Sequence, residues 1–181
     1  VIAAFSSLIT TTHTALKADF FTDMKGLDWI QQIILDESAS SKILKKVYFM
    51  LYDLIVKETD KSIDTVLYKE NLIKDYIISQ KSMIVRMLET LDYDKDPEDL
   101  YSDHVLREFV LNCLGAVFQY KEELLKDDVV NHFEKCIEKL DRHIDHIEES
   151  KGDQDIIDVL SKEKSLINSI LEKSGDFLLI H

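Results

Sequence analysis

Three histidines and one cysteine share one face of a helix predicted near residues 129–147. They are His132, Cys136, His143 and His146, and at 100° per residue they fall within an arc of roughly 80°. Imidazole and thiolate groups bind zinc, so the face resembles a metal site. However, His132 and His146 would lie about 21 Å apart along the helix, so one ion could bind only one close pair. We therefore expect no metal site and interpret the four residues as the boundary of an apolar core.

Other catalytic or cofactor chemistry is hard to assemble from this sequence. The four glycines are isolated from one another, which excludes a P-loop and a dinucleotide fingerprint. The acids of residues 92–103 lack the spacing and the glycine of an EF-hand. Cys113 and Cys136 form no CxxC pair; in an oxidising compartment they could pair, whereas a buried free thiol is commoner. We expect no catalytic site and no cofactor, although an enzyme using His143 and His146 is an alternative.

Two helix faces are the candidate partner-binding sites. On the first, residues spaced by 4, 3, 4 and 4 fall on one side of a long helix: Lys42, Lys46, Phe49, Asp53 and Lys57. On the second, a later helix carries polar residues at comparable positions: Glu108, Asn112 and Gln119. Mixed charge around one aromatic residue suits a protein partner. The alternative is that both faces are simply solvated.

Composition and charge limit the possible partners. The 181 residues amount to about one domain, with 45% hydrophobic and 31% charged residues. The net charge of −13 argues against nucleic acid and against an anionic membrane surface, because both attract basic proteins. Only four glycines and one proline are present, which disfavours a β-sandwich or barrel. The chain begins with an apolar pattern and without methionine, so we expect it to be a piece of a longer protein.

Helical periodicity runs through almost the whole chain and predicts an all-α protein. We expect helices over residues 14–24, 27–34, 43–55, 104–120, 129–147 and 156–171, and one or two more within 66–91. The clearest loop is residues 92–103, which contains Pro97. On the last helix the expected inner residues are Ile156, Val159, Leu160, Ile167, Ile170 and Leu171. The expected outer residues are Asp158, Lys162, Lys164 and Glu172.

An internal repeat aligns residues 1–9, 47–55 and 110–118 without gaps. The first offset, 46 residues, falls in the range of armadillo and HEAT units. We therefore predict an armadillo-like right-handed superhelical solenoid of three-helix repeats over residues 1–121, with a partial first repeat at 1–10 and an irregular insertion at about 59–103. Residues 122–181 would form a C-terminal helical cap. The expected core residues are Phe5, Leu8, Leu27, Ile30, Leu51, Leu54, Leu114 and Val117. An ordinary helical bundle is the alternative.

Four segments carry a resemblance to a known family. They are FFTDMKGLDWIQQII (20–34), KKVYFMLYDLIVKE (45–58), HVLREFVLNCLGAVFQYKEEL (104–124) and SLINSILEK (165–173). The chain resembles the armadillo-type nucleotide exchange factors of DnaK-type (70-kDa heat-shock) chaperones. Its resemblance is greatest to the endoplasmic-reticulum lumenal members that serve BiP.

That resemblance implies a regulator and not an enzyme. Its partner would be the ATPase domain of BiP, whose nucleotide cleft it would hold open so that ADP leaves, without contacting the nucleotide itself. The activity would support protein translocation and folding in the endoplasmic-reticulum lumen. Two alternatives are a cytosolic member of the same family and an armadillo scaffold that binds another protein or a peptide. Peptide-binding armadillo arrays use asparagine ladders, and the comparable positions here are Ser7, Asp53 and Ala116.

Overall fold

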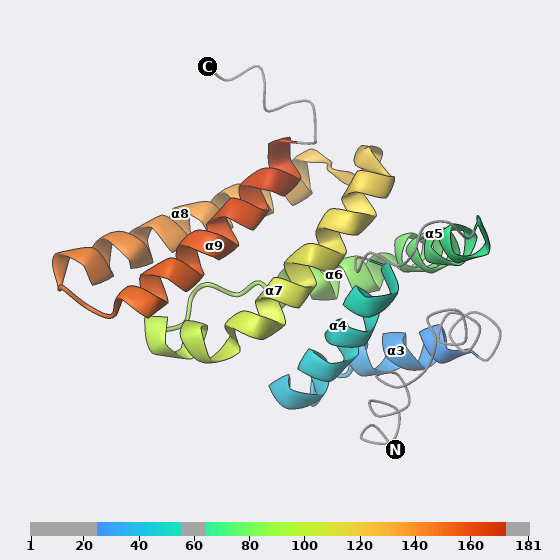
Figure 1. Ribbon diagram of the computed structural model, residues 1–181, viewed down its shortest axis with the longest axis horizontal. Helices are drawn as coiled ribbons and strands as arrows, with labels where there is room; N and C mark the ends of the chain where they lie inside the picture. The colour runs from blue at the N-terminus through green and yellow to red at the C-terminus, as the bar shows by residue number, and fades with distance from the viewer. Residues whose placement is uncertain (1–24, 56–63, 173–181) are drawn as a thin grey trace. The chain divides into compact units, whose positions relative to one another are not determined.

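The computed structural model describes residues 25–55 and 64–172, and every regular element in these ranges is helical (Figure 1). The helices are α3 (Gly26–Leu35), α4 (Ser41–Ile55), α5 (Asp64–Ser79), α6 (Lys81–Glu89), α7 (Pro97–Tyr120), α8 (Asp127–Glu149) and α9 (Gln154–Leu171), with a short 3-10 turn at Glu122–Leu124. The predicted all-α fold class is confirmed. Phe5, Leu8 and Lys57 lie outside the described residues.

The chain divides into two compact units, residues 1–87 and 88–181. The division predicted at residues 121 and 122 falls inside the second unit. The region expected to be an irregular insertion, about 59–103, contains α5 and α6 and the first turns of α7. Two helices do lie within residues 66–91, as the periodicity predicted.

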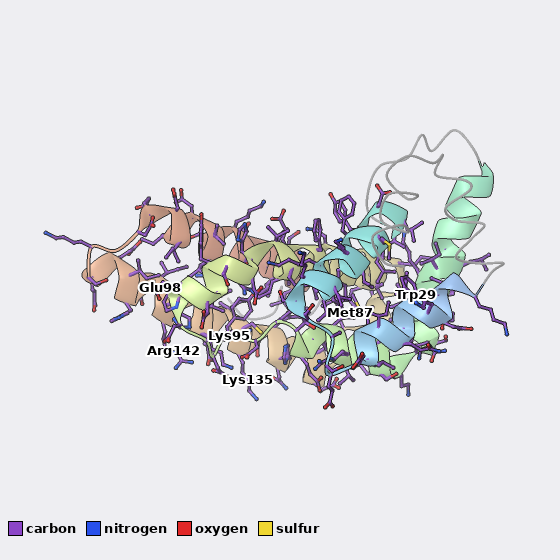
Figure 2. All side chains as sticks on the ribbon, turned by 90° about the horizontal axis from the view of Figure 1, so that it is seen from below. Trp29, Met87, Lys95, Glu98, Lys135 and Arg142 are labelled. Atoms are coloured by element: carbon purple, nitrogen blue, oxygen red, sulfur yellow. The ribbon has the colours of Figure 1, made fainter. Side chains whose placement is uncertain are left out.

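In the first unit, α4 packs against both α3 and α5. The predicted core residues Leu27, Ile30, Leu51 and Leu54 are all buried, as their helical spacing predicted. Trp29, the only tryptophan of the chain, projects from α3 (Figure 2).

A polar contact also joins α3 to α5 within the first unit. The Tyr76 hydroxyl lies 2.6 Å from Asp28 Oδ1 and 2.9 Å from Gln31 Oε1, and the Gln31 amide donates to Gln80 at 3.0 Å. The pKa of Tyr76 is raised, first by burial and then by the adjacent Asp28 carboxylate. The hydroxyl therefore stays protonated and holds the two helices as a donor.

In the second unit, α9 packs against both α7 and α8 and runs antiparallel to α8 (Figure 1). Leu114 and Val117 are fully buried, as predicted. The rings of Phe118 on α7 and Phe133 on α8 meet edge to face, with centroids 6.2 Å apart. This geometry is the favourable one for two aromatic rings in a core.

The last helix, α9, begins two residues earlier than predicted and buries a slightly different side. Leu160, Ile167, Ile170 and Leu171 are buried as expected, whereas Ile156 and Val159 are only half-buried. Their places in the core are taken by Ile157 and, unexpectedly, by the acid Glu163. Of the expected outer residues, Asp158, Lys162 and Glu172 are exposed, and Lys164 is half-buried beside Asp141.

Helix α7 begins seven residues earlier than the sequence suggested, so most of the predicted loop 92–103 is helix. Pro97 occupies the first turn, where the missing N–H costs nothing, and Asp96 precedes it in an extended conformation. Glu98 and Asp99 then place negative charge at the positive end of the helix dipole. Leu100 is fully buried, which anchors this turn to the core.

Gly152 lies in the turn between α8 and α9, as expected, and glycine is needed there because a side chain would not fit. Its N–H donates to the Ile147 carbonyl at 2.8 Å, and a Cβ at this position would lie 2.8 Å from Ile147 Cγ2. The left-handed residue of the turn is Lys151, with φ 56°. A side chain at position 152 would therefore clash where the chain folds back on the helix end.

Candidate functional site

The predicted face of α4 is accessible only along the first half of the helix. Lys42 is exposed, and Lys46 and Phe49 are half-buried. These three residues follow one another at spacings of 4 and 3, so they form a continuous strip with two ammonium groups beside one aromatic ring. We call Lys42, Lys46 and Phe49 the α4 strip.

Asp53 does not extend this strip, because its side chain is only 6% exposed. Around it, Met50, Leu51, Leu54 and Ile55 are also buried, so most of the last turns of α4 is covered, with Tyr52 half-buried. Helical spacing places Asp53 on the same face as Lys46 and Phe49. Spacing alone could not show that other residues cover this end of α4. Asp53 is therefore buried and not accessible on this face, and its contact with a partner stays an untested prediction.

The second predicted face, on α7, is partly accessible. Gln119 is exposed, while Glu108 and Asn112 are half-buried. The Glu108 carboxylate pairs with Lys162 of α9 at 2.8 Å, and Asn112 Nδ2 donates to the Glu108 carbonyl oxygen at 2.8 Å. This face and the α4 strip belong to different units, and each stands as a separate candidate surface.

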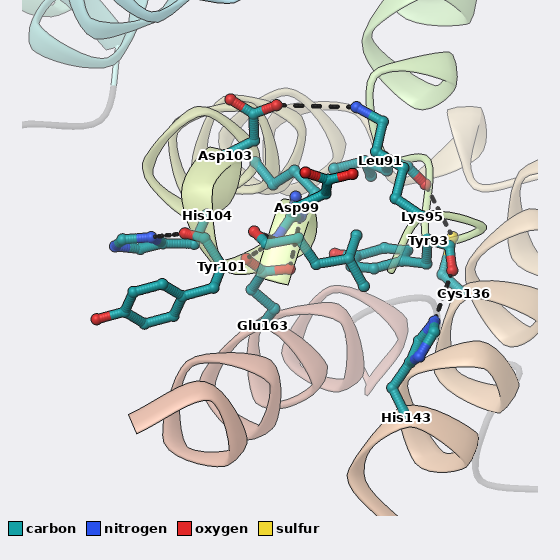
Figure 3. Close-up of polar contacts among 12 residues, drawn as sticks. Leu91, Tyr93, Lys95, Asp99, Tyr101, Asp103, His104, Cys136, His143 and Glu163 are labelled. Carbon is teal, nitrogen blue, oxygen red and sulfur yellow. Dashed lines mark hydrogen bonds and ion pairs between the residues drawn. The ribbon is translucent and has the colours of Figure 1, made fainter. Parts of the chain in front are cut away.

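The histidine and cysteine face of α8 contacts Leu88, near the end of α6, and the connector between α6 and α7 (Figure 3). His132 Nε2 lies 3.1 Å from the Leu88 carbonyl oxygen, and His143 Nε2 lies 2.9 Å from that of Tyr93. Between them, Cys136 Sγ lies 3.7 Å from the Leu91 carbonyl oxygen. A fourth contact is the ion pair between Lys139 and Asp94, at 2.7 Å. We call the four α8 residues that make these contacts, His132, Cys136, Lys139 and His143, the α8 clip.

The clip explains why histidine suits these positions. A carbonyl oxygen can only accept a hydrogen bond, so in both histidines Nε2 must carry the proton. The spacing of 4, 3 and 4 residues places all four side chains within an arc of about 60° around the helix, where they meet residues 88–94. The α8 clip therefore contacts the carbonyl of Leu88, in the last turn of α6, and those of Leu91 and Tyr93, in the connector that follows α6. His146 is exposed and takes no part.

Among residues 25–55 and 64–172, no group of three or more histidine, cysteine or acidic side chains could hold a metal ion. Cys113 and Cys136 are both buried and free. Burial raises the pKa of each thiol, to about 12 for Cys136. Neither thiol is therefore a thiolate nucleophile at neutral pH.

The α8 clip should make stability depend on pH. The pKa of His132 is lowered, chiefly by burial, with the ammonium groups of Lys139 and Lys135 adding to the effect and the Leu88 carbonyl opposing it. The unfolded chain, with an ordinary histidine pKa of about 6.5, then takes up a proton before the native state does. The contribution of His132 is fully present above that value, and the free energy of unfolding falls as the pH drops from about 6.5 towards the native pKa.

This pH effect can be measured by denaturant unfolding at a series of pH values between 5 and 8. His132→Gln keeps an amide donor for the Leu88 carbonyl but cannot titrate, so it should flatten the slope below pH 6.5. His146→Gln removes an exposed histidine of the same helix and should leave the slope unchanged. A slope that survives His132→Gln would contradict the assignment.

The most buried charged residues were not singled out by the sequence. Arg107 of α7 and Glu163 of α9 are each 2% exposed and form a two-pronged ion pair, with nitrogen-to-oxygen distances of 2.9 and 3.0 Å. Arg107 also donates to the Leu100 carbonyl and lies over the buried Tyr93 ring, 5.3 Å from its centroid. Burial and the Glu163 charge raise the pKa of Tyr93, so its hydroxyl stays protonated.

One signal in the sequence could have revealed this pair. Glu163 lies in the series Leu160, Glu163, Ile167 and Ile170, whose spacing of 3, 4 and 3 is that of a buried helix face. An acid at such a position needs a buried basic partner. The partner of Glu163 is Arg107, which lies 56 residues away in the sequence. A local sequence pattern cannot show which basic residue the packing brings to it.

No helix within the described ranges is long and apolar enough to span a membrane. Comparison of the chain with models of protein families, with curated proteins and with solved structures gave no match.

Proposed function

We propose that this chain is a nucleotide exchange factor that binds the ATPase domain of a DnaK-type chaperone and promotes release of ADP. The proposal starts from the resemblance carried by residues 20–34 and 45–58. The observation that supports a binding role is the α4 strip, where Lys42, Lys46 and Phe49 are accessible on one continuous face. A partly exposed aromatic ring beside cations is typical of a surface that binds a folded protein.

The segment that carries the resemblance has two different roles in this proposal. Leu51, Asp53 and Leu54 are buried, so the Leu-Tyr-Asp-Leu run supports a shared helical packing and not a contact with the partner. We assign the contact instead to the first half of α4. For the architecture we propose an armadillo-like solenoid of three-helix repeats. In such a solenoid the long third helix of each repeat lines the concave face.

Exchange by such a protein needs binding energy alone. A factor that binds the open chaperone more tightly than the ADP-closed form must weaken ADP binding by the same ratio. A fifty-fold effect corresponds to only about 2.3 kcal/mol of differential contact. We place this activity in the endoplasmic-reticulum lumen, with BiP as partner.

The proposal predicts a loss of exchange activity when the α4 strip is altered. Phe49→Ala should raise the dissociation rate from the BiP ATPase domain by about tenfold, because truncating a central aromatic anchor has the largest cost in an interface. Lys46→Glu should slow association, most strongly at low salt. Stopped-flow release of a fluorescent ADP analogue and surface-immobilised binding measure the two effects.

Matched controls separate this surface from general effects of charge and truncation. Lys135→Glu reverses an exposed charge on α8, and Val85→Ala truncates a side chain that is 53% exposed on α6. Both should leave exchange unchanged. If Lys46→Glu combined with Phe49→Ala folds normally and still accelerates ADP release, the α4 strip is not the interface.

The unaltered chain also distinguishes the alternatives. Binding to the ATPase domain without faster ADP release would favour a scaffold, and a preference for a cytosolic chaperone over BiP would favour the cytosolic member of the family. No binding to either chaperone would overturn the proposal.

A further inference from the structure

A small hollow lies in the second unit, between α7 and α9. It has a volume of about 120 Å³ and is lined by His104, Glu108, Val159, Lys162, Glu163 and Leu166. Val159 and Leu166 contribute apolar surface, and the other four residues contribute polar or charged groups. The volume is close to that of a cavity that admits benzene, so the hollow has room for the end of one side chain.

The polar groups around the hollow are mostly hydrogen-bond acceptors. His104 Nδ1 lies 2.5 Å from the Tyr101 carbonyl oxygen, so Nδ1 is the donor there, and in that tautomer Nε2 is an acceptor. Glu108 uses one carboxylate oxygen to bind Lys162, at 2.8 Å, and its side chain is 33% exposed. Glu163 is already paired with Arg107, at 2.9 Å.

One lining residue, His104, belongs to a stacked aromatic pair. The rings of Tyr101 and His104 stack with centroids 5.3 Å apart (Figure 3). Tyr101 is among the few large hydrophobic residues of the described chain that are exposed. A flat cation could lie against such rings while it donates hydrogen bonds.

A lysine of the hollow, Lys162, already places a positive charge beside the Glu108 carboxylate. Lys162 is the only cation among the six lining residues, and its side chain is 60% exposed. An ion pair this exposed contributes little and exchanges readily. An incoming cation that is better desolvated could therefore replace Lys162 at Glu108.

From these contacts we infer that the hollow between α7 and α9 receives an arginine side chain of a protein partner. The guanidinium donates to Glu108 and to His104 Nε2, and the aliphatic stem packs on Val159 and Leu166. Arginine fits better than lysine because its planar head presents several donors at once and stacks on aromatic rings. The net charge of −13 on the chain attracts a basic partner segment at long range.

This inference extends the proposed function by naming one group on the partner, but its first test needs no chaperone. The probe is N-acetyl-argininamide, titrated into the whole isotope-labelled chain and followed by NMR. We expect saturable shifts of the His104 ring and of the Val159 and Leu166 methyl groups. N-acetyl-citrullinamide has nearly the same shape without the charge and should bind about tenfold more weakly.

Three variants test the chemistry of the hollow. Glu108→Gln should weaken binding of the arginine probe about tenfold, and Lys162→Met, which removes the competing cation, should strengthen it about threefold. Glu138→Gln removes one exposed acid of α8 and should change neither. Equal binding of the citrulline probe, absence of shifts at the hollow, or an unaltered affinity in Glu108→Gln would each overturn the inference.

The chaperone experiment then separates the two proposals. If the arginine probe binds but the BiP ATPase domain does not, the inference of an arginine site is supported and the proposed exchange function is contradicted. If the ATPase domain binds and Glu108→Gln leaves its affinity unchanged, the proposed function stands and the hollow is not part of that interface. If Glu108→Gln weakens both, one arginine of the partner is the group to be sought.

Discussion

Replacing Glu163 by alanine is expected to destabilise the protein by about 3–5 kcal/mol, which is a large part of the stability of an ordinary domain. The substitution leaves the Arg107 guanidinium 2% exposed, without its carboxylate partner. An uncompensated charge in the core is costly because the surrounding groups cannot replace the water that it lost. Denaturant unfolding followed by far-ultraviolet circular dichroism measures the loss.

A double substitution shows whether the charge itself is responsible. Arg107→Met with Glu163→Leu removes both charges and roughly keeps the volume, so it should recover most of the lost stability or exceed the parent protein. Glu138→Ala, an exposed acid on α8, should change stability by no more than about 0.5 kcal/mol. A double variant less stable than Glu163→Ala alone would contradict this account of the pair.

Leu51→Ala should cost the first unit about 2–5 kcal/mol, because it removes a fully buried side chain from α4 and leaves a cavity. Trp29 is the only tryptophan and lies on α3 of the same unit, so its fluorescence reports unfolding there. The matched control is Leu35→Ala, at an exposed position of α3. If Leu51→Ala costs less than about 0.5 kcal/mol, Leu51 is not a core residue.

Helix positions could be predicted well where the apolar periodicity is strong. The segments expected at 129–147 and 156–171 are α8 (Asp127–Glu149) and α9 (Gln154–Leu171), within two residues at each end. The first turns of α7 were missed because they are acidic, and Leu100 is the only buried residue among them. Asp96 and Pro97 are ordinary helix-start signals, and they identify this boundary when they are weighed above the polarity.

The candidate sites were predictable only in part. The strip of Lys42, Lys46 and Phe49 follows from helical spacing, which a sequence shows directly. The burial of Asp53 does not follow from spacing, because it depends on what encloses the end of α4. The Arg107–Glu163 pair likewise joins two helices 56 residues apart, and the choice of partner is made by packing.

The α8 clip also sets an order of events during synthesis of the chain. Its four contacts join residues 44 to 50 positions apart, and in each the connector residue precedes the α8 residue. At the usual rate of translation the connector is made about 2–10 seconds before the side chains that bind it. The Leu91 and Tyr93 carbonyls therefore lack these partners on the nascent chain until α8 is made, and this part of the second unit is completed late.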